Sequence, residues 1–200
     1  MEILIIVIGI VLIIALEIIF NLNKKRIPDK LTQLLLEHRF DEFDALMDKK
    51  TTKLFVKAFN YYYLKLNKSI IVKNNKDAQD CFEKLVQMKT NNAQRKSVLF
   101  KKFYFYLSLN DKQKAKEAYD NYKELADDDL SDIDIMYDTF ILGKATYLDK
   151  TLVAYNKAPK EKLPDLDLLL SEMYKNKNDN KNADKYTKLA QTHLNDLNNN

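Results

Sequence analysis

The sequence is poor in the residues that interrupt helices and form tight turns. The chain of 200 residues contains only 2 glycines and 3 prolines. Strands joined by tight turns need such residues, because glycine adopts left-handed backbone angles and proline presets a turn. The composition therefore excludes a protein built from many short strands and predicts an all-α fold.

Cysteine is nearly absent. A single residue of this type, Cys81, excludes an internal disulfide framework and fits a reducing compartment. It lies one turn into an amphipathic segment, close to Phe82 and Leu85. We therefore expect a buried small side chain at this position.

The sequence also lacks the signatures of catalysis and of metal binding. Gly9 and Gly143 are the only glycines, so no glycine-rich loop can hold a phosphate. His38 and His193 lie far apart in polar helical segments, without the paired histidine–carboxylate spacing of a metal site. No nucleophile motif is present. We predict a protein that is not an enzyme, with no catalytic residues, no metal site, no cofactor and no small-molecule substrate.

Arginine is rare among the basic residues. Of 33 basic residues only Arg26, Arg39 and Arg95 are arginines, and the lysines are accompanied by many asparagines. Without Glu2 and Glu17, the 29 acidic residues of the chain fall to 27, which leaves a formal charge of +6 after the first apolar run. Phosphate-binding surfaces favour arginine forks. We interpret the lysines as codon bias and predict no nucleic-acid partner.

What the sequence does contain is a long apolar run, from Ile3 to Phe20, interrupted only by Gly9 and Glu17. Helix of this length spans about 27 Å, close to the hydrocarbon thickness of a bilayer. A cleaved signal peptide would start with basic residues and end with small ones, and this segment does neither. We predict an uncleaved transmembrane anchor over residues 1–23, with a signal peptide and a buried globular helix as alternatives.

Three basic residues, Lys24, Lys25 and Arg26, follow this run, and none precedes it. Because basic flanks stay in the cytoplasm, we expect the N-terminus outside the cell membrane and the remainder inside, a single-pass topology. Glu17 lies about one turn from the cytoplasmic end, where its carboxylate can reach the interface. Residues 24–28 form the predicted juxtamembrane linker.

The remaining chain, residues 29–197, divides into amphipathic segments separated by short polar joints, and residues 198–200 are a predicted disordered tail. The predicted joints are residues 74–77, 90–92, 110–111, 127–129, 158–164 and 176–180. Ser131 and Pro164, each followed by an aspartate, are typical of helix starts.

A spacing recurs along these segments. Near the C-terminus, Leu170 and Ser171 are followed by a spaced set of aromatic and small residues, namely Tyr174, Ala183, Tyr186 and Ala190. Part of this spacing occurs earlier in the chain, first as Ala78 and Phe82 and then as Tyr106, Ala115 and Tyr119. The interval from Ala115 to Ala183 is 68 residues, twice 34, with a degenerate unit over residues 131–157 between them. The intervals from Phe43 to Ala78 and from Ala78 to Ala115 are 35 and 37 residues.

This spacing resembles the tetratricopeptide repeat, a helical hairpin with a period of 34 residues. The resemblance covers roughly residues 29–197 and implies a right-handed α-solenoid of about five helical hairpins. The last unit departs from the family pattern at Asp167, Asn178 and Asn195, which replace a large aromatic residue, the turn glycine and the closing proline. Related helical-hairpin arrays with looser motifs are the alternative.

Two segments are rich in aromatic residues: Phe55, Phe59 and Tyr61–Tyr63, then Phe100 and Phe103–Tyr106. We expect each segment to form one helix that is buried on nearly every face, as between two neighbouring repeats. The alternative is that some rings line a concave peptide groove. In the repeat register, the residues facing that groove would be Ser97, Phe100 and Tyr104.

The resemblance also bears on the type of partner. Some family members hold a C-terminal carboxylate through basic residues, but Phe100 stands where such a residue would be needed. The acidic stretch over residues 127–138 is predicted to be a solvated loop and helix start, with attraction of a basic segment as the alternative.

Together these patterns predict a bacterial, membrane-anchored scaffold or adaptor that presents a helical repeat array to the cytoplasm and binds a protein or peptide. Two alternatives remain open. One is a chaperone for protein export that is tethered outside the membrane, and the other is a structural subunit of a larger membrane complex.

Overall fold

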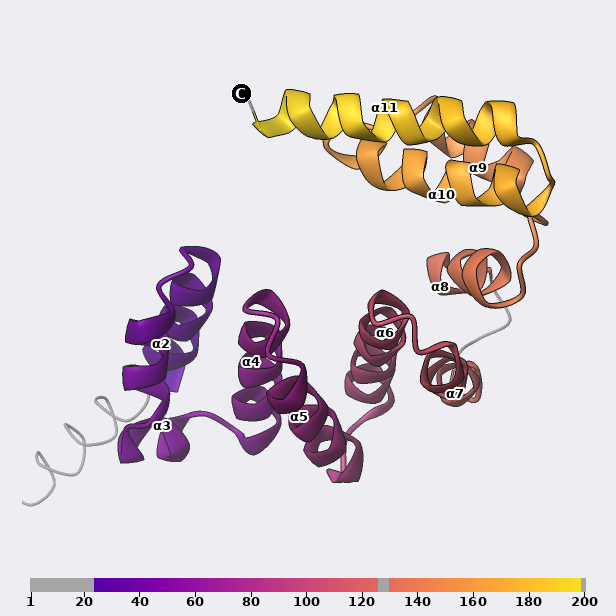
Figure 1. Cartoon of the computed structure of the whole chain (residues 1–200). Helices are drawn as coiled ribbons and strands as arrows, with labels where there is room; N and C mark the ends of the chain where they lie inside the picture. Colours follow the sequence, from indigo (N-terminus) through magenta and orange to yellow (C-terminus); the bar gives the residue numbers. More distant parts are fainter. Residues whose placement is uncertain (1–23, 126–129, 199–200) are drawn as a thin grey trace, which may run out of the picture. The chain divides into compact units, whose positions relative to one another are not determined.

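The computed structural model describes residues 24–125 and 130–198. Within these ranges the chain is almost entirely helical and contains no strand (Figure 1). The prediction of an all-α fold is confirmed.

None of the helices in these two ranges is long and apolar enough to cross a membrane. The predicted anchor, residues 1–23, lies outside the described residues, as do the acidic joint at residues 127–129 and the last two residues of the predicted tail. Lys24, Lys25 and Arg26 are exposed, and the predicted linker over residues 24–28 is helical and continuous with residues 29–36.

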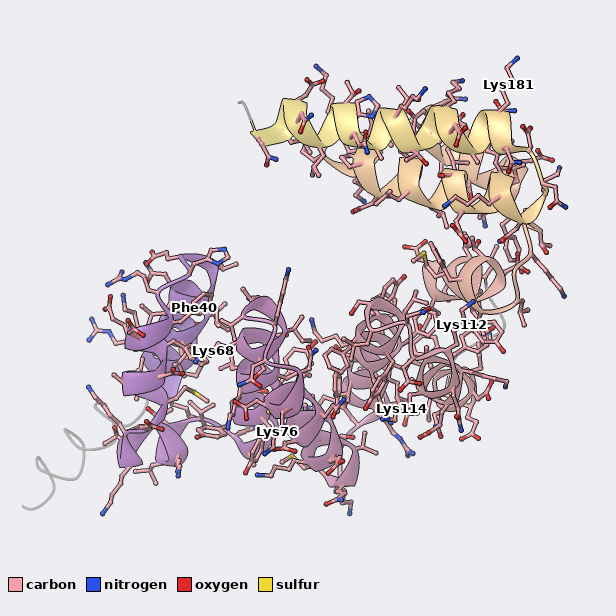
Figure 2. The ribbon with its side chains drawn as sticks, viewed as in Figure 1. Phe40, Lys68, Lys76, Lys112, Lys114 and Lys181 are labelled. Carbon is pink, nitrogen blue, oxygen red and sulfur yellow. The ribbon has the colours of Figure 1, made fainter. Side chains whose placement is uncertain are left out.

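The chain divides into two compact units, Met1–Val98 and Leu99–Asn200, and the boundary falls inside α6 (Asn92–Ser108). Besides residues 24–36 and the start of α6, the first unit contains α2 (Phe40–Met47), α3 (Lys50–Phe55), α4 (Ala58–Ile71) and α5 (Asn75–Gln87). One cluster of its buried core consists of Leu31, Leu34, Leu35, Phe43, Met47 and Val56. Lys68 of α4, labelled in Figure 2, forms an ion pair with Asp44 of α2.

The first aromatic segment is not one helix. Phe55 ends α3, whereas Phe59 and the following tyrosines belong to α4. Between them Val56 adopts extended backbone angles, φ −102° and ψ 119°, and is only 4% exposed. The helix is interrupted because this turn directs the Val56 side chain into the core. The tyrosines of α4 are only partly buried, so the predicted burial on every face is wrong for this helix.

The second unit continues from α6 into α7 (Lys112–Lys123), α8 (Asp132–Met136), a π-helical turn η1 (Tyr137–Ile141) and α9 (Leu148–Tyr155). A short η2 (Lys160–Lys162) leads into α10 (Leu163–Asn176) and α11 (Asn180–Asn198). α10 and α11 pack side by side (Figure 1). Where they meet, Ser171 Oγ donates a hydrogen bond of 3.0 Å to the carbonyl oxygen of Ala183.

The two predicted helix starts are confirmed. Ser131 occupies the N-cap of α8, and its backbone N–H donates to the carboxylate of Asp134 at 2.8 Å. Pro164 lies in the first turn of α10, and Asp165 follows it. Proline is tolerated there because the backbone N–H groups of the first turn have no hydrogen-bond acceptor within the helix.

Left-handed backbone angles mark the ends of successive helices. The residues with φ between 55° and 63° in the described ranges are His38, Lys73, Asn110, Gly143 and Asn178. Their successive intervals are 35, 37, 33 and 35 residues. A residue with left-handed backbone angles commonly ends a helix, because it lets the last carbonyl groups of the helix accept hydrogen bonds from the N–H groups that follow. Among the described residues, a left-handed turn at the end of a helix therefore recurs about every 35 residues.

The turns share further features. At three of them the next residue, Asn74, Asp111 or Asp179, caps the second helix by accepting a hydrogen bond from the backbone N–H three residues later. The fifth residue after each left-handed position is buried, and these residues are Phe43, Ala78, Ala115, Leu148 and Ala183. Ala78, Ala115 and Ala183 are thus buried, as expected for small residues where two helices meet, and Leu148 occupies the equivalent position after Gly143.

Candidate functional site

The predicted groove residues lie on α6. Ser97, Phe100 and Tyr104 are separated by three and four residues, so they follow one another along a single face of this helix. Their surroundings differ, and the structure divides them into a serine that is engaged within the first unit and two rings that belong to the second unit.

Ser97 is occupied by an internal contact. Its Oγ lies 2.7 Å from the hydroxyl oxygen of Tyr63 on α4, in a partly buried position. Because this hydrogen bond connects two helices of the same unit, we assign Ser97 a role in helix packing.

Phe100 and Tyr104 form an aromatic cluster with Tyr122 of α7. The ring centroids of Phe100 and Tyr104 lie 4.7 Å apart with an interplanar angle of 45°, and those of Phe100 and Tyr122 lie 6.4 Å apart at 54°. Phe100 is 37% exposed, which is high for a phenylalanine. We call these three residues the aromatic triad.

Asp132, the first residue of α8, is near enough to Tyr104 for its negative charge to act on the tyrosine hydroxyl. Burial raises the pKa of Tyr104 to about 12, and the nearby negative charge of Asp132 contributes to this rise. Tyr104 therefore stays protonated and neutral at physiological pH. Asp132 itself is exposed and, within the ranges that the structure describes, forms neither an ion pair nor a hydrogen bond.

Further aromatic rings pack against the aromatic triad. Phe103 is completely buried, and its ring meets Tyr104 edge-on at 5.3 Å and Tyr119 at 6.3 Å. The ring of Tyr119 in turn stacks on Tyr137 of η1, with centroids 3.8 Å apart and planes within 4°. Such close packing restricts the rotamers of these rings, so they hold the ring of Tyr104 in a defined position.

A hydrogen-bond network fixes the same layer. The Tyr119 hydroxyl donates to the nearly buried carboxylate of Asp134 at 2.8 Å, and Lys123 lies 3.3 Å from that carboxylate. Burial alone would raise the pKa of Asp134, but these donors and those of Ser131 outweigh it and hold the pKa below its usual value. The network ties α7 to α8 and so positions Asp132 relative to Tyr122.

The two histidines have different environments. His38 lies in a turn with φ 55°, not in a helix as predicted, because its left-handed angles end the helix over residues 24–36. His193 contacts the fully buried carboxylate of Asp167. No single-sequence signal pairs these two residues, because 26 positions separate them. The residues that the structure describes contain no group of three or more potential metal ligands of the histidine, cysteine or carboxylate type.

A cavity of about 270 Å³ lies between α2, α4 and the start of α5. Apolar side chains such as Phe43 and Met47 form part of its wall. Two of its charged groups are already engaged with each other, the carboxylate of Asp44 with Lys68. The cavity is smaller than the ~300–1,000 Å³ of ordinary ligand sites. The aromatic triad, whose polar neighbour is unpaired, is therefore the stronger candidate.

Comparison of the chain with protein-family models, with curated proteins and with solved structures finds no match. Its function is therefore inferred from its own surface and sequence.

Proposed function

We propose that this protein is a membrane-anchored scaffold that presents an array of helical hairpins resembling tetratricopeptide repeats to the cytoplasm and binds a protein partner, without catalysis. The observation that carries the proposal is the aromatic triad, in which Phe100 is exposed and Tyr104 and Tyr122 are partly buried, on helices with a recurring turn. Exposed rings on a well-packed base are typical of the residues that dominate protein interfaces.

The recurring turn supports a repeat architecture. Hairpins of about 35 residues, with a buried residue at the same register position, resemble units that stack and share a continuous core. Arrays of this kind present extended surfaces for binding, and the exposed Phe100 lies on one of the repeated helices.

The apolar run from Ile3 to Phe20 and the basic residues after it support the proposed membrane anchor and cytoplasmic orientation. A tether raises the effective concentration of a bound partner at the membrane, which is the purpose of an adaptor. A C-terminal fusion to a reporter that is active only in the cytoplasm tests this topology. An active reporter supports the adaptor, whereas activity only of an exported reporter favours the tethered chaperone.

Binding through the aromatic triad can be tested by photo-crosslinking in cells. A photoreactive phenylalanine analogue replaces Phe100 in the full chain, and a matched variant carries the analogue at Gln113, an exposed residue of α7. We expect one identifiable protein crosslinked from position 100 and not from position 113. Equal crosslinking from both positions, or none, would contradict the proposal.

Two truncations separate recognition from folding. Tyr104→Ala should reduce the crosslinked yield with little change in melting temperature, because the ring is only partly buried. Tyr106→Ala should lower the melting temperature, because Tyr106 is 6% exposed and belongs to the core. An equal loss of melting temperature in both variants would show that the triad is simply part of the core.

A further inference from the structure

Several tyrosines of this protein already carry a cation on their rings. Lysine ammonium groups lie 4.9 Å from the ring centroid of Tyr62, 5.2 Å from that of Tyr106 and 5.1 Å from that of Tyr186. In the described part of the chain, no lysine or arginine lies in this way over a ring of the aromatic triad. Within the described ranges, the cation sites on the three rings are therefore not taken by a basic residue of this chain.

Two basic residues that are neighbours of the aromatic triad in sequence form ion pairs with other carboxylates. Lys102 of α6 lies 3.5 Å from the carboxylate of Glu117, and Lys123 of α7 lies 3.3 Å from that of Asp134. The exposed carboxylate of Asp132, in contrast, has no ion pair within the described ranges. The charge of Asp132 is thus not neutralised by an ion pair within the part of the chain that the structure describes.

We propose that the aromatic triad and Asp132 bind a basic side chain, preferably an arginine, from the partner protein. The inference rests on the proposed function and specifies the chemistry of the partner. A cation within about 6 Å of an aromatic ring centroid is attracted to the ring face. A guanidinium group can stack on a ring through its plane and at the same time donate hydrogen bonds to a carboxylate.

The carboxylate distinguishes this partner from a lipid headgroup. A trimethylammonium group has no N–H and gains only charge attraction from Asp132, whereas arginine and lysine donate hydrogen bonds to it. Sites that bind choline surround its cation with aromatic rings on several sides. Here the rings are accompanied by the carboxylate of Asp132, which can accept hydrogen bonds that choline cannot donate. We therefore infer a protein segment with an arginine or a lysine.

The test uses the full chain in detergent micelles, with para-fluorophenylalanine in place of Phe100 as a reporter for fluorine NMR. The probes are acetyl-arginine amide, the uncharged isostere acetyl-citrulline amide, and phosphocholine. We expect saturable shifts with the arginine probe, roughly fivefold weaker binding of the citrulline probe, and weakening of the arginine signal by salt. Equal binding of the first two probes, no binding of either, or tighter binding of phosphocholine would overturn the inference.

Two matched variants test the carboxylate. Asp132→Asn removes its charge and should weaken binding of the arginine probe by roughly fivefold. Asp149→Asn changes an exposed aspartate in the first turn of α9 and should have no effect. Equal effects of the two variants would contradict a role for Asp132.

The inference and the proposed function can fail separately. If photo-crosslinking at position 100 captures a partner but the arginine and citrulline probes bind equally, the scaffold function stands and the preference for a cation is wrong. If the arginine probe binds selectively but no partner is captured in cells, the site stands and the scaffold function is wrong.

Discussion

His193 and Asp167 connect the last two helices through a contact of 2.6 Å between Nδ1 of the imidazole and Oδ2 of the carboxylate. Asp167 is completely buried, and among the described residues its Oδ1 has no hydrogen-bond partner of ordinary geometry. The pKa of Tyr155 on α9 is raised to about 12, mainly by burial and in addition by its interaction with the same carboxylate of Asp167. A single imidazole is thus the main partner of a carboxylate that water does not reach.

This dependence predicts an asymmetry between two substitutions. His193→Ala leaves the buried carboxylate without its donor and should lower the free energy of unfolding by about 2–3 kcal/mol. Asp167→Leu removes the carboxylate together with its desolvation penalty and should be nearly neutral or stabilising. The measurement is urea unfolding followed by circular dichroism. In the Asp167→Leu background, His193→Ala should cost much less, and an unchanged cost would refute this account of the pair.

The pKa of Asp134 predicts a pH dependence of stability. The pKa of this carboxyl is lower in the folded protein than in the unfolded chain, so its contribution is present above the unfolded value and is lost as pH falls through the folded value. Asp134→Asn should therefore destabilise the protein by about 1–3 kcal/mol at neutral pH. Below about pH 4 the difference between this variant and the natural protein should shrink.

The matched control for this experiment is Asp132→Asn, two residues earlier on the same helix. Its carboxylate is exposed and unbonded within the described ranges, so the unfolding free energy should change by less than about 0.5 kcal/mol. If both variants lost the same stability, the hydrogen bonds to Asp134 would not be the cause.

Lys73 predicts a stabilising substitution. It has φ 56° at the turn between α4 and α5, where the next N–H, that of Asn74, donates to the carbonyl oxygen of Ser69 at 2.8 Å. Since L-residues are strained at this φ and glycine is not, Lys73→Gly should raise the unfolding free energy by about 0.5–1 kcal/mol. Lys76→Gly, in the first turn of α5, should lower it by less than about 1 kcal/mol, because glycine is unfavourable in a helix. Differential scanning calorimetry should show opposite shifts in melting temperature.

Ala115 tests the packing of the recurring unit. It is completely buried on α7, so Ala115→Leu should destabilise the protein by about 1–3 kcal/mol through overpacking. The same change at Asn198, which is exposed at the end of α11, should have almost no effect. Denaturant midpoints of the two variants give the comparison, and tolerance of leucine at position 115 would mean that the two helices do not meet closely there.

The sequence alone predicted the features that depend on neighbouring residues. Scarce glycine and proline predicted helices, and Ser131 and Pro164 predicted helix starts, because capping involves atoms within one turn. The spacing of Ala78, Ala115 and Ala183 predicted buried small residues, because each follows its own turn by the same number of positions. These determinants are local and can be recognised in one dimension.

Only the tertiary structure determined the features that join distant segments. Val56 interrupts the helix within the first aromatic segment because its side chain packs into a core formed by residues 24–47. Helical propensity describes only the local backbone preference and cannot predict this contact with a distant segment. In the sequence, Asp167 is only a departure from the repeat pattern, whereas in the fold it is buried against His193, 26 residues away. The pairing of the aromatic triad with Asp132 likewise depends on how α6, α7 and α8 pack. Burial and charge act between residues that folding brings together, so their partners are defined only once the helices have packed.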